Sequence, residues 1–234
     1  MEDYSALLEQ AITLGSERRY REAVNTLLHL ISKTDHYSEA YLYLGRSFHA
    51  LGEYAKAVDA LRHFIHLHPS SAAGYFFAGR SYLSAGRART AAGYLEKAVQ
   101  LRPDFISALQ LLGYAYLKSG AIEKAVKVLA GAVEMDRENQ RLFTGYLNAL
   151  FVHALKQFRL GAYQYAGQLF QYLLEHGREH ILIYIHQGMI YRMDGELEAA
   201  VNAYENIDSY DYREAREVET VPLIKRTITD ITKL

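Results

Sequence analysis

A spacing of 34 residues between equivalent small residues constrains this chain more than any other feature of its sequence. Two sets of glycines and one set of alanines keep this interval: Gly45, Gly79 and Gly113; Gly52, Gly86 and Gly120; Ala57, Ala91 and Ala125. Pro69 and Pro103 are separated by the same distance. Self-similarity at such a fixed period indicates that one supersecondary unit is copied along the chain. The fold must therefore be built from stacked copies of that unit.

Each copy carries the pattern of two amphipathic helices. In residues 38–69 the apolar positions recur at steps of three and four residues: Tyr41, Leu44 and Phe48, then Tyr54, Val58, Leu61 and Ile65. Gly45 and Ala57 are small, which predicts a close approach of the two helices. We expect Gly52 to end the first helix in the left-handed conformation and Pro69 to end the second.

A helix–turn–helix unit of this length with these small residues resembles the tetratricopeptide repeat. We expect six copies, at residues 4–37, 38–71, 72–105, 106–139, 147–180 and 181–214. The first copy lacks the turn glycine and carries Arg18 in its turn. A single pair of helices cannot bury its apolar face, so neighbouring copies must stack. The resemblance implies an all-α fold, a right-handed α-solenoid of six helix pairs.

The repeat pattern is interrupted once, by seven inserted residues at 140–146. Only Gly145 disfavours helix in this stretch, so the insertion is expected to extend the first helix of the fifth copy to about 20 residues. An apolar stripe runs along it: Phe143, Leu147, Phe151, Ala154 and Phe158. We favour packing of this stripe in the core of an enlarged repeat. An exposed ridge for dimerisation or a ligand is the alternative.

The end of the chain is predicted to cap the array, which makes residues 1–214 the repeat domain and 215–234 a terminal segment. Pro222 would fall at the small position of a seventh repeat, so no seventh repeat is expected. Proline suits the start of a helix, and Ile224, Ile228 and Ile231 then follow at helical spacing. Solenoids need a terminal element with one polar face, and we expect a short capping helix there.

Composition excludes several functional classes. The chain has no cysteine, which removes disulfides, thiolate metal sites and cysteine nucleophiles. The 26 basic and 27 acidic residues give a net charge of −1, without the basic footprint of a nucleic-acid binder. No apolar run approaches the roughly 20 residues of a membrane helix. The acidic start does not resemble a secretory leader. We therefore expect a cytoplasmic protein that neither inserts into a membrane nor binds nucleic acid.

No catalytic or metal-binding motif stands out. His63, His66 and His68 lie close together, but no carboxylate follows at ligand spacing, so packed or solvated histidines are favoured. The sequence contains no metalloprotease motif, phosphate-binding loop or dinucleotide fingerprint. We expect no enzymatic activity, cofactor or metal.

The resemblance implies that the first helices of successive repeats line a concave groove. The expected groove positions are mostly apolar, carry several cations and hold a single acid, Glu39. An apolar solvated face requires something to cover it. The candidate groove residues are Leu42, Arg46, Phe76, Arg80, Leu83, Tyr114, Leu117, Lys118, Phe151, Leu155, Phe158, Arg159, Ile185, Met189 and Arg192.

These residues predict a protein or peptide partner that is amphipathic and acidic, with Phe76, Tyr114, Phe151 and Phe158 as its anchors. The Lys/Asn set with which this family clamps a C-terminal carboxylate is missing in every register. The leading hypothesis is a non-catalytic adaptor or scaffold. The alternatives are a structural protein that forms homo-oligomers through the groove or the long helix, and the non-catalytic arm of a larger enzyme or a secretion or assembly chaperone.

Overall fold

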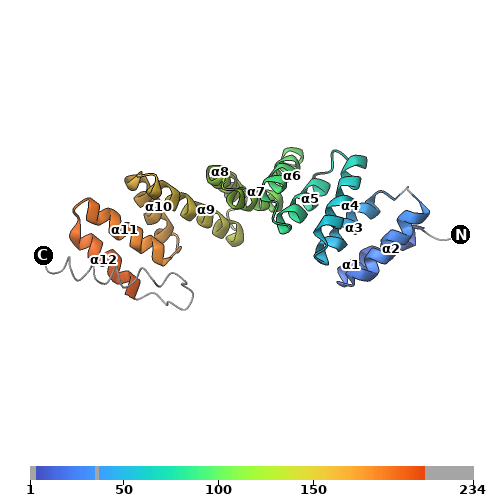
Figure 1. Cartoon of the computed structure of the whole chain (residues 1–234), viewed down its shortest axis with the longest axis horizontal. Coiled ribbons are helices and arrows are strands. Elements are labelled where there is room, and N and C mark those ends of the chain that lie inside the picture. The colour runs from blue at the N-terminus through green and yellow to red at the C-terminus, as the bar shows by residue number, and fades with distance from the viewer. Residues whose placement is uncertain (1–3, 35–36, 209–234) are drawn as a thin grey trace. The chain divides into compact units, whose positions relative to one another are not determined.

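The computed structural model describes residues 4–34 and 37–208, and this part of the chain contains twelve α-helices and no strand (Figure 1). The helices follow one another in six pairs: α1 (Tyr4–Ser16) and α2 (Tyr20–Lys33), α3 (Glu39–Ala50) and α4 (Tyr54–Leu67), α5 (Ala72–Ser84) and α6 (Ala88–Leu101), α7 (Ile106–Ser119) and α8 (Ile122–Met135), α9 (Gln140–Arg159) and α10 (Tyr163–Glu175), α11 (Ile181–Met193) and α12 (Leu197–Asp208). The prediction of an all-α array of helix pairs is confirmed.

The chain divides into two compact units, Met1–Tyr146 and Leu147–Leu234. We call them unit 1 and unit 2. The sequence predicts one array over residues 1–214, whereas the division falls within α9, directly after the seven-residue insertion. The capping helix predicted for residues 215–234 lies outside the described residues.

Small residues allow the two helices of a pair to pack closely, as the sequence predicts. An ideal Cβ on Gly79 would lie 2.7 Å from Cγ of Leu95, and one on Gly113 would lie 2.5 Å from Cγ of Leu129. Real Cβ atoms essentially never approach another atom so closely. The leucines that occupy this space recur every 34 residues on the second helices and are buried: Leu27, Leu61, Leu95 and Leu129. Glycine is therefore required by packing at these crossings.

The turns between paired helices have the predicted geometry. Gly52, Gly86 and Gly120 adopt positive φ angles of 79°, 77° and 83°. In the first pair, which has no glycine at this place, Arg18 takes the same conformation with φ at 62°. It is the non-glycine residue with positive φ in the described part of the chain. The backbone geometry of the turn is thus kept even where the favourable residue is missing.

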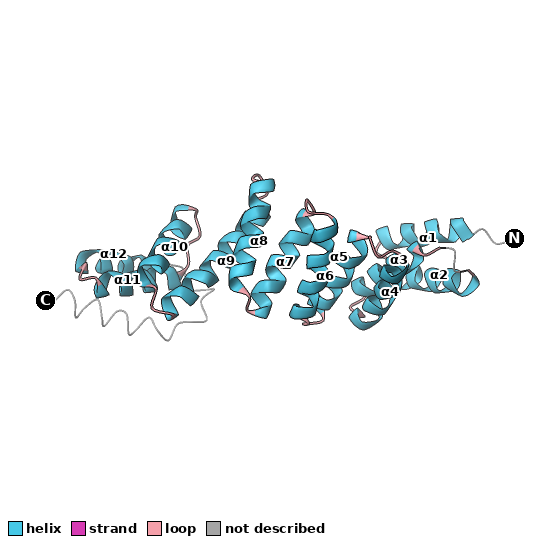
Figure 2. Cartoon of the chain, turned by 90° about the horizontal axis from the view of Figure 1, so that it is seen from above, coloured by secondary structure: helices cyan, strands magenta, loops and turns pink. Residues whose placement is uncertain are grey.

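Neighbouring pairs in unit 1 stack through the second helix of one pair and the first helix of the next. Contacts join α2 to α3, α4 to α5 and α6 to α7. Helices α6 and α7 lie side by side in Figures 1 and 2. The Tyr116 hydroxyl on α7 donates a hydrogen bond of 2.5 Å to the Glu96 carboxylate on α6. The first helices α1, α3, α5 and α7 also contact one another in sequence. They form one surface, which we call the first-helix face of unit 1.

The inserted residues form one continuous helix with the start of the fifth pair. α9 runs for 20 residues from Gln140 to Arg159, which confirms the predicted long helix. Within its apolar stripe, Leu147, Phe151 and Ala154 are buried, and the two end residues Phe143 and Phe158 are half-buried. This burial supports the interpretation that the stripe is part of the core.

Candidate functional site

The predicted groove residues of unit 1 lie on α3, α5 and α7, which belong to the first-helix face. Their exposure differs along this face. Arg46, Tyr114 and Lys118 are exposed, and the Lys118 ammonium lies 5.3 Å from the centroid of the Tyr114 ring. Four others are half-buried: Leu42, Arg80, Leu83 and Leu117. A partner at this face would therefore meet cations and half-covered leucine side chains.

The predicted residues of unit 2 lie on α9 and α11. Arg159, Met189 and Arg192 are exposed, whereas Leu155 and Phe158 are half-buried. The Phe158 ring contacts His186 with ring centroids 4.6 Å apart. Ile185 is buried. The exposed members of this set are thus two arginines and one methionine.

Two of the four expected aromatic anchors are packed inside the helical layers. Phe76 is 9% exposed, and its ring lies 4.7 Å from the ring of Phe105, centroid to centroid. Phe151 is also 9% exposed and packs against the ring of His180. Their side chains therefore contribute to packing within each unit, and their role as anchors for a partner stays a prediction. Tyr114, at 47% exposed, and the half-buried Phe158 are the more accessible aromatic rings.

The first-helix face of unit 1 contains a cleft of about 320 Å³. This volume lies within the range typical of ligand sites. Its wall comes from α1, the start of α2, α3 and α5, with Ile12, Tyr20 and Tyr43 as the larger side chains and with Arg46 and Arg80. The cleft thus brings two cations together with apolar surface.

Arg46 and Arg80 share one aromatic ring. Their guanidinium carbons lie 4.9 Å and 4.8 Å from the centroid of the Phe77 ring, and Arg46 also lies 5.3 Å from the Tyr43 ring. A guanidinium close to an aromatic ring is attracted by the ring quadrupole. Sequence analysis named both arginines and missed Phe77, although three consecutive aromatic residues, Tyr75 to Phe77, marked this helix.

The two arginines have no anionic partner in the described part of the chain. Neither guanidinium forms an ion pair with any carboxylate there. The Nε atom of Arg80 is buried without a hydrogen-bond partner. Burial, and then the charge of Arg46, lower the pKa of Arg80. The site therefore holds two like charges in a partly desolvated place, an arrangement that an anion would stabilise.

His49 lies next to this pair, on α3. Its Nδ1 atom is 3.1 Å from the Ser81 hydroxyl on α5. Burial, and secondarily the charge of Arg80, lower the pKa of His49 to about 4. At neutral pH the imidazole is uncharged, so the arginines carry the positive charge of the site.

Two family profiles, both described as tetratricopeptide repeat, match residues 8–72 and 82–144. The chain is a tetratricopeptide repeat protein. Several solved structures are similar to this chain. The crystal structure of MamA shares 29% sequence identity with it; the match covers 59% of this chain and 81% of that chain, with a TM-score of 0.56. MamA 41-end from Desulfovibrio magneticus RS-1 has 22% identity, 76% and 97% coverage and a TM-score of 0.61. A thermophilic tetratricopeptide repeat protein from Thermus thermophilus has 15% identity, 99% and 100% coverage and a TM-score of 0.51.

The last two similarities show the fold alone, and no curated protein matches the sequence significantly. Tetratricopeptide repeat proteins are generally protein-interaction scaffolds, with binding surfaces formed by the stacked repeats. The first-helix face of unit 1, with its cleft and unpaired arginines, is therefore the candidate interaction surface of this tetratricopeptide repeat protein.

The histidines considered as metal ligands make other contacts in this tetratricopeptide repeat protein. The His63 ring lies 4.0 Å from the Tyr41 ring, centroid to centroid, and the His68 Nε2 atom lies 2.6 Å from the Ser38 hydroxyl. Among the described residues, no cluster of three or more potential ligands is present. In the same residues no helix combines the length and the apolar character of a membrane span. The cytoplasmic location stays a prediction.

Proposed function

We propose that this tetratricopeptide repeat protein is a non-catalytic scaffold that holds an acidic, amphipathic segment of a protein partner. The segment lies on the first-helix face of unit 1. The observation that carries the proposal is the pair Arg46 and Arg80, which share the Phe77 ring beside the cleft and have no carboxylate partner among the described residues.

The chemistry of the cleft favours a carboxylate next to an apolar side chain. Guanidinium groups form strong, geometrically defined hydrogen bonds with carboxylates, and neither Arg46 nor Arg80 has a carboxylate partner among the described residues. Ile12 and Tyr43 supply apolar surface in the same cleft. A partner carboxylate would relieve the repulsion between the arginines, and its apolar neighbour would cover the exposed part of Ile12.

Further contacts are proposed along the same surface and in unit 2. Lys118 and the accessible Tyr114 offer a second cation and an aromatic ring on α7. In unit 2, Arg159, Met189 and Arg192 offer exposed contacts of similar chemistry. We expect the exposed cations Lys118, Arg159 and Arg192 to speed association and orient the partner more than they raise the affinity.

A displayed library of random peptides, selected on the full chain, tests this proposal. We expect selected peptides to carry Asp or Glu beside an apolar residue. Fluorescence anisotropy then measures the affinity of one selected peptide for the parent chain and for the double variant Arg46→Gln and Arg80→Gln. We expect the affinity to fall at least about tenfold, because charge-assisted hydrogen bonds are lost.

Arg62→Gln is the matched control, since Arg62 is an exposed arginine on the second helix α4. This variant should bind the peptide like the parent. Selected peptides without acidic residues, or unchanged affinity in the folded double variant, would contradict the proposal.

A further inference from the structure

The contact between α10 and α11 differs from the equivalent contact between α2 and α3 at two repeat positions. Gly167 on α10 stands where every other copy holds valine or alanine: Val24, Val58, Ala92, Val126 and Val201. Gln187 on α11 stands at a position that is apolar in the three middle copies, with Leu44, Ala78 and Leu112, and polar in the first and fifth, with Gln10 and His153. At the contact between α2 and α3 these positions belong to the core, since Val24 and Leu44 lie in one buried cluster. At α10 and α11 a missing side chain and a polar side chain replace that packing.

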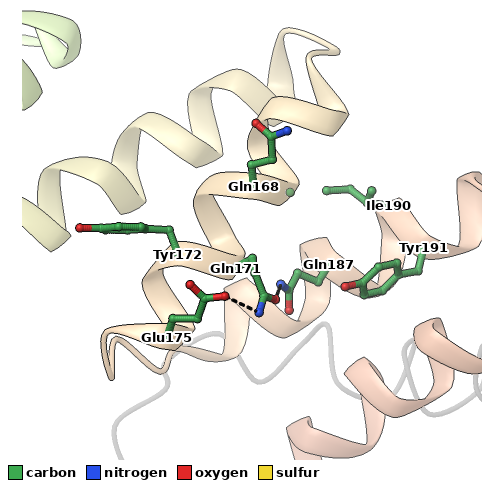
Figure 3. A pocket seen from close by; sticks show the side chains of 8 residues that line it. Gln168, Gln171, Tyr172, Glu175, Gln187, Ile190 and Tyr191 are labelled. Carbon is green, nitrogen blue, oxygen red and sulfur yellow. Dashed lines mark hydrogen bonds between the residues drawn. The ribbon is translucent and has the colours of Figure 1, made fainter.

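A cavity of about 490 Å³ lies at this place in unit 2 (Figure 3). Its wall consists of Gly167, Gln168, Gln171, Tyr172 and Glu175 from α10 and Gln187, Ile190 and Tyr191 from α11. A Cβ on Gly167 would meet only Ile190, at 3.6 Å and 4.0 Å, which is ordinary contact. Packing therefore does not require glycine here, in contrast to Gly79 and Gly113. The glycine leaves open a space that valine occupies in other repeats.

Three side chains in the cavity form a hydrogen-bonded chain with a defined direction. A carboxylate only accepts hydrogen bonds, so the Gln171 amide nitrogen must face Glu175, to whose Oε1 atom it donates at 3.1 Å. The Gln171 Oε1 atom then faces Gln187 and accepts from its Nε2 atom at 3.4 Å (Figure 3). Because the Glu175 carboxylate can only accept, it determines the orientation of the Gln171 amide, and the Gln171 oxygen then determines that of Gln187.

This direction leaves hydrogen-bond acceptors at both ends of the chain. At one end, the Oε1 atom of Gln187 receives no hydrogen bond from any described residue, although the side chain is only 6% exposed. At the other end, the second carboxylate oxygen of Glu175 retains its capacity to accept. Glu175 is also the charged residue of the cavity wall. The cavity therefore offers acceptors and one negative charge, and it suits a cationic donor.

We propose that this cavity binds the side chain of an arginine from a protein partner. A guanidinium carries five donors in a planar fork, which suits acceptors such as the Glu175 carboxylate and the Gln187 amide oxygen. The ring of Tyr191, in the same wall, supplies an aromatic surface for the cation. Ile190 and Gly167 leave an apolar wall for the methylene groups. This cavity is formed by a different part of the sequence from the Arg46 and Arg80 site, and its charge is negative where that site is positive.

Nuclear magnetic resonance titration of the full chain tests the proposal with Nα-acetyl-arginine methylamide as the probe. We expect saturable shifts of the Gln171 and Gln187 side-chain amide signals, with a millimolar dissociation constant for so small a probe. Nα-acetyl-citrulline methylamide has nearly the same shape without the charge, and it should bind at least tenfold more weakly.

Two variants locate the binding. Gly167→Val introduces the residue that most other repeats hold and should fill the cavity, and Gln187→Leu removes the amide acceptor. Each should reduce probe binding at least tenfold, and a melting temperature at or above that of the parent would show that the fold is kept. Equal shifts with citrulline, binding that persists in folded Gly167→Val or Gln187→Leu, or no saturable shift in the parent would overturn the proposal. Arg46→Gln with Arg80→Gln should leave probe binding unchanged, so this test is independent of the proposed scaffold function.

Discussion

The Nδ1 atom of His49 on α3 lies 3.1 Å from the Oγ atom of Ser81 on α5, one repeat further along the chain. Ser81 has a single hydroxyl proton, which it donates to the Phe77 carbonyl oxygen at 2.9 Å. Its oxygen can then only accept from His49, so the neutral imidazole carries its proton on Nδ1. Acidification must add the second proton to Nε2 of a half-buried ring close to Arg80.

This arrangement predicts an acid-sensitive stability. The pKa of His49 is lowered to about 4 in the fold, below its ordinary value near 6.5. Between these values the unfolded chain binds the proton more readily, so the contribution of His49 is present above pH 6.5 and is lost as the pH falls toward 4. We expect a loss of about 1 kcal/mol after allowing for solvent screening. Urea unfolding at several pH values measures it.

His49→Gln should flatten this part of the pH profile, and His66→Gln is the matched control because His66 is exposed. A profile that keeps its slope between pH 6.5 and 4 in folded His49→Gln would contradict the assignment.

Glycine at a helix crossing should not tolerate a side chain. Gly79→Leu would place its Cβ 2.7 Å from Cγ of Leu95, and overpacking of this kind costs roughly 1–3 kcal/mol or more. Gly93→Leu on α6 is the control, because a Cβ there meets nothing within 4 Å. It should be neutral or stabilising through helix propensity. Chemical unfolding of both variants decides the point, and equal midpoints would show that Gly79 is not a packing glycine.

The first turn offers a stabilising substitution. Arg18 has a positive φ of 62°, which costs a side-chain-bearing residue roughly 1–2 kcal/mol relative to glycine. Arg18→Gly should therefore stabilise the protein by about 0.5–1 kcal/mol, part of the gain being offset by the entropy of the unfolded chain. The reciprocal change Gly86→Arg, at φ of 77° and with open space around it, should destabilise by a similar amount. Thermal unfolding compares them, and a lower melting temperature for Arg18→Gly would be inconsistent with backbone strain.

Buried and accessible aromatic residues should respond differently to truncation. Phe76→Ala is expected to lower the free energy of unfolding by about 3–5 kcal/mol, because its ring packs at 9% exposure. Tyr114→Ala, at 47% exposure, should leave stability nearly unchanged and weaken peptide binding. Calorimetry and binding of the selected acidic peptide separate the effects. Unchanged peptide affinity in folded Tyr114→Ala would remove this residue from the binding surface.

Sequence alone determined the features that depend on residues close together in the chain. Spacing every 34 residues predicted the helix pairs, the packing glycines Gly45, Gly79 and Gly113, and the left-handed turn residues. The absence of strong helix breakers predicted α9 across the insertion. These features follow from helical periodicity and from the lack of a Cβ in glycine, and neither needs knowledge of distant neighbours.

Tertiary structure decided what depends on contacts between repeats. It buried Phe76 and Phe151, brought the unpaired guanidiniums of Arg46 and Arg80 to the same Phe77 ring, and opened the cavity beside Gly167. Whether a side chain at a given repeat position is covered depends on its rotamer and on the size of the residue that the next repeat presents. Periodicity assigns a residue to a helix face, and only the packed neighbours determine how much of it remains available to a partner.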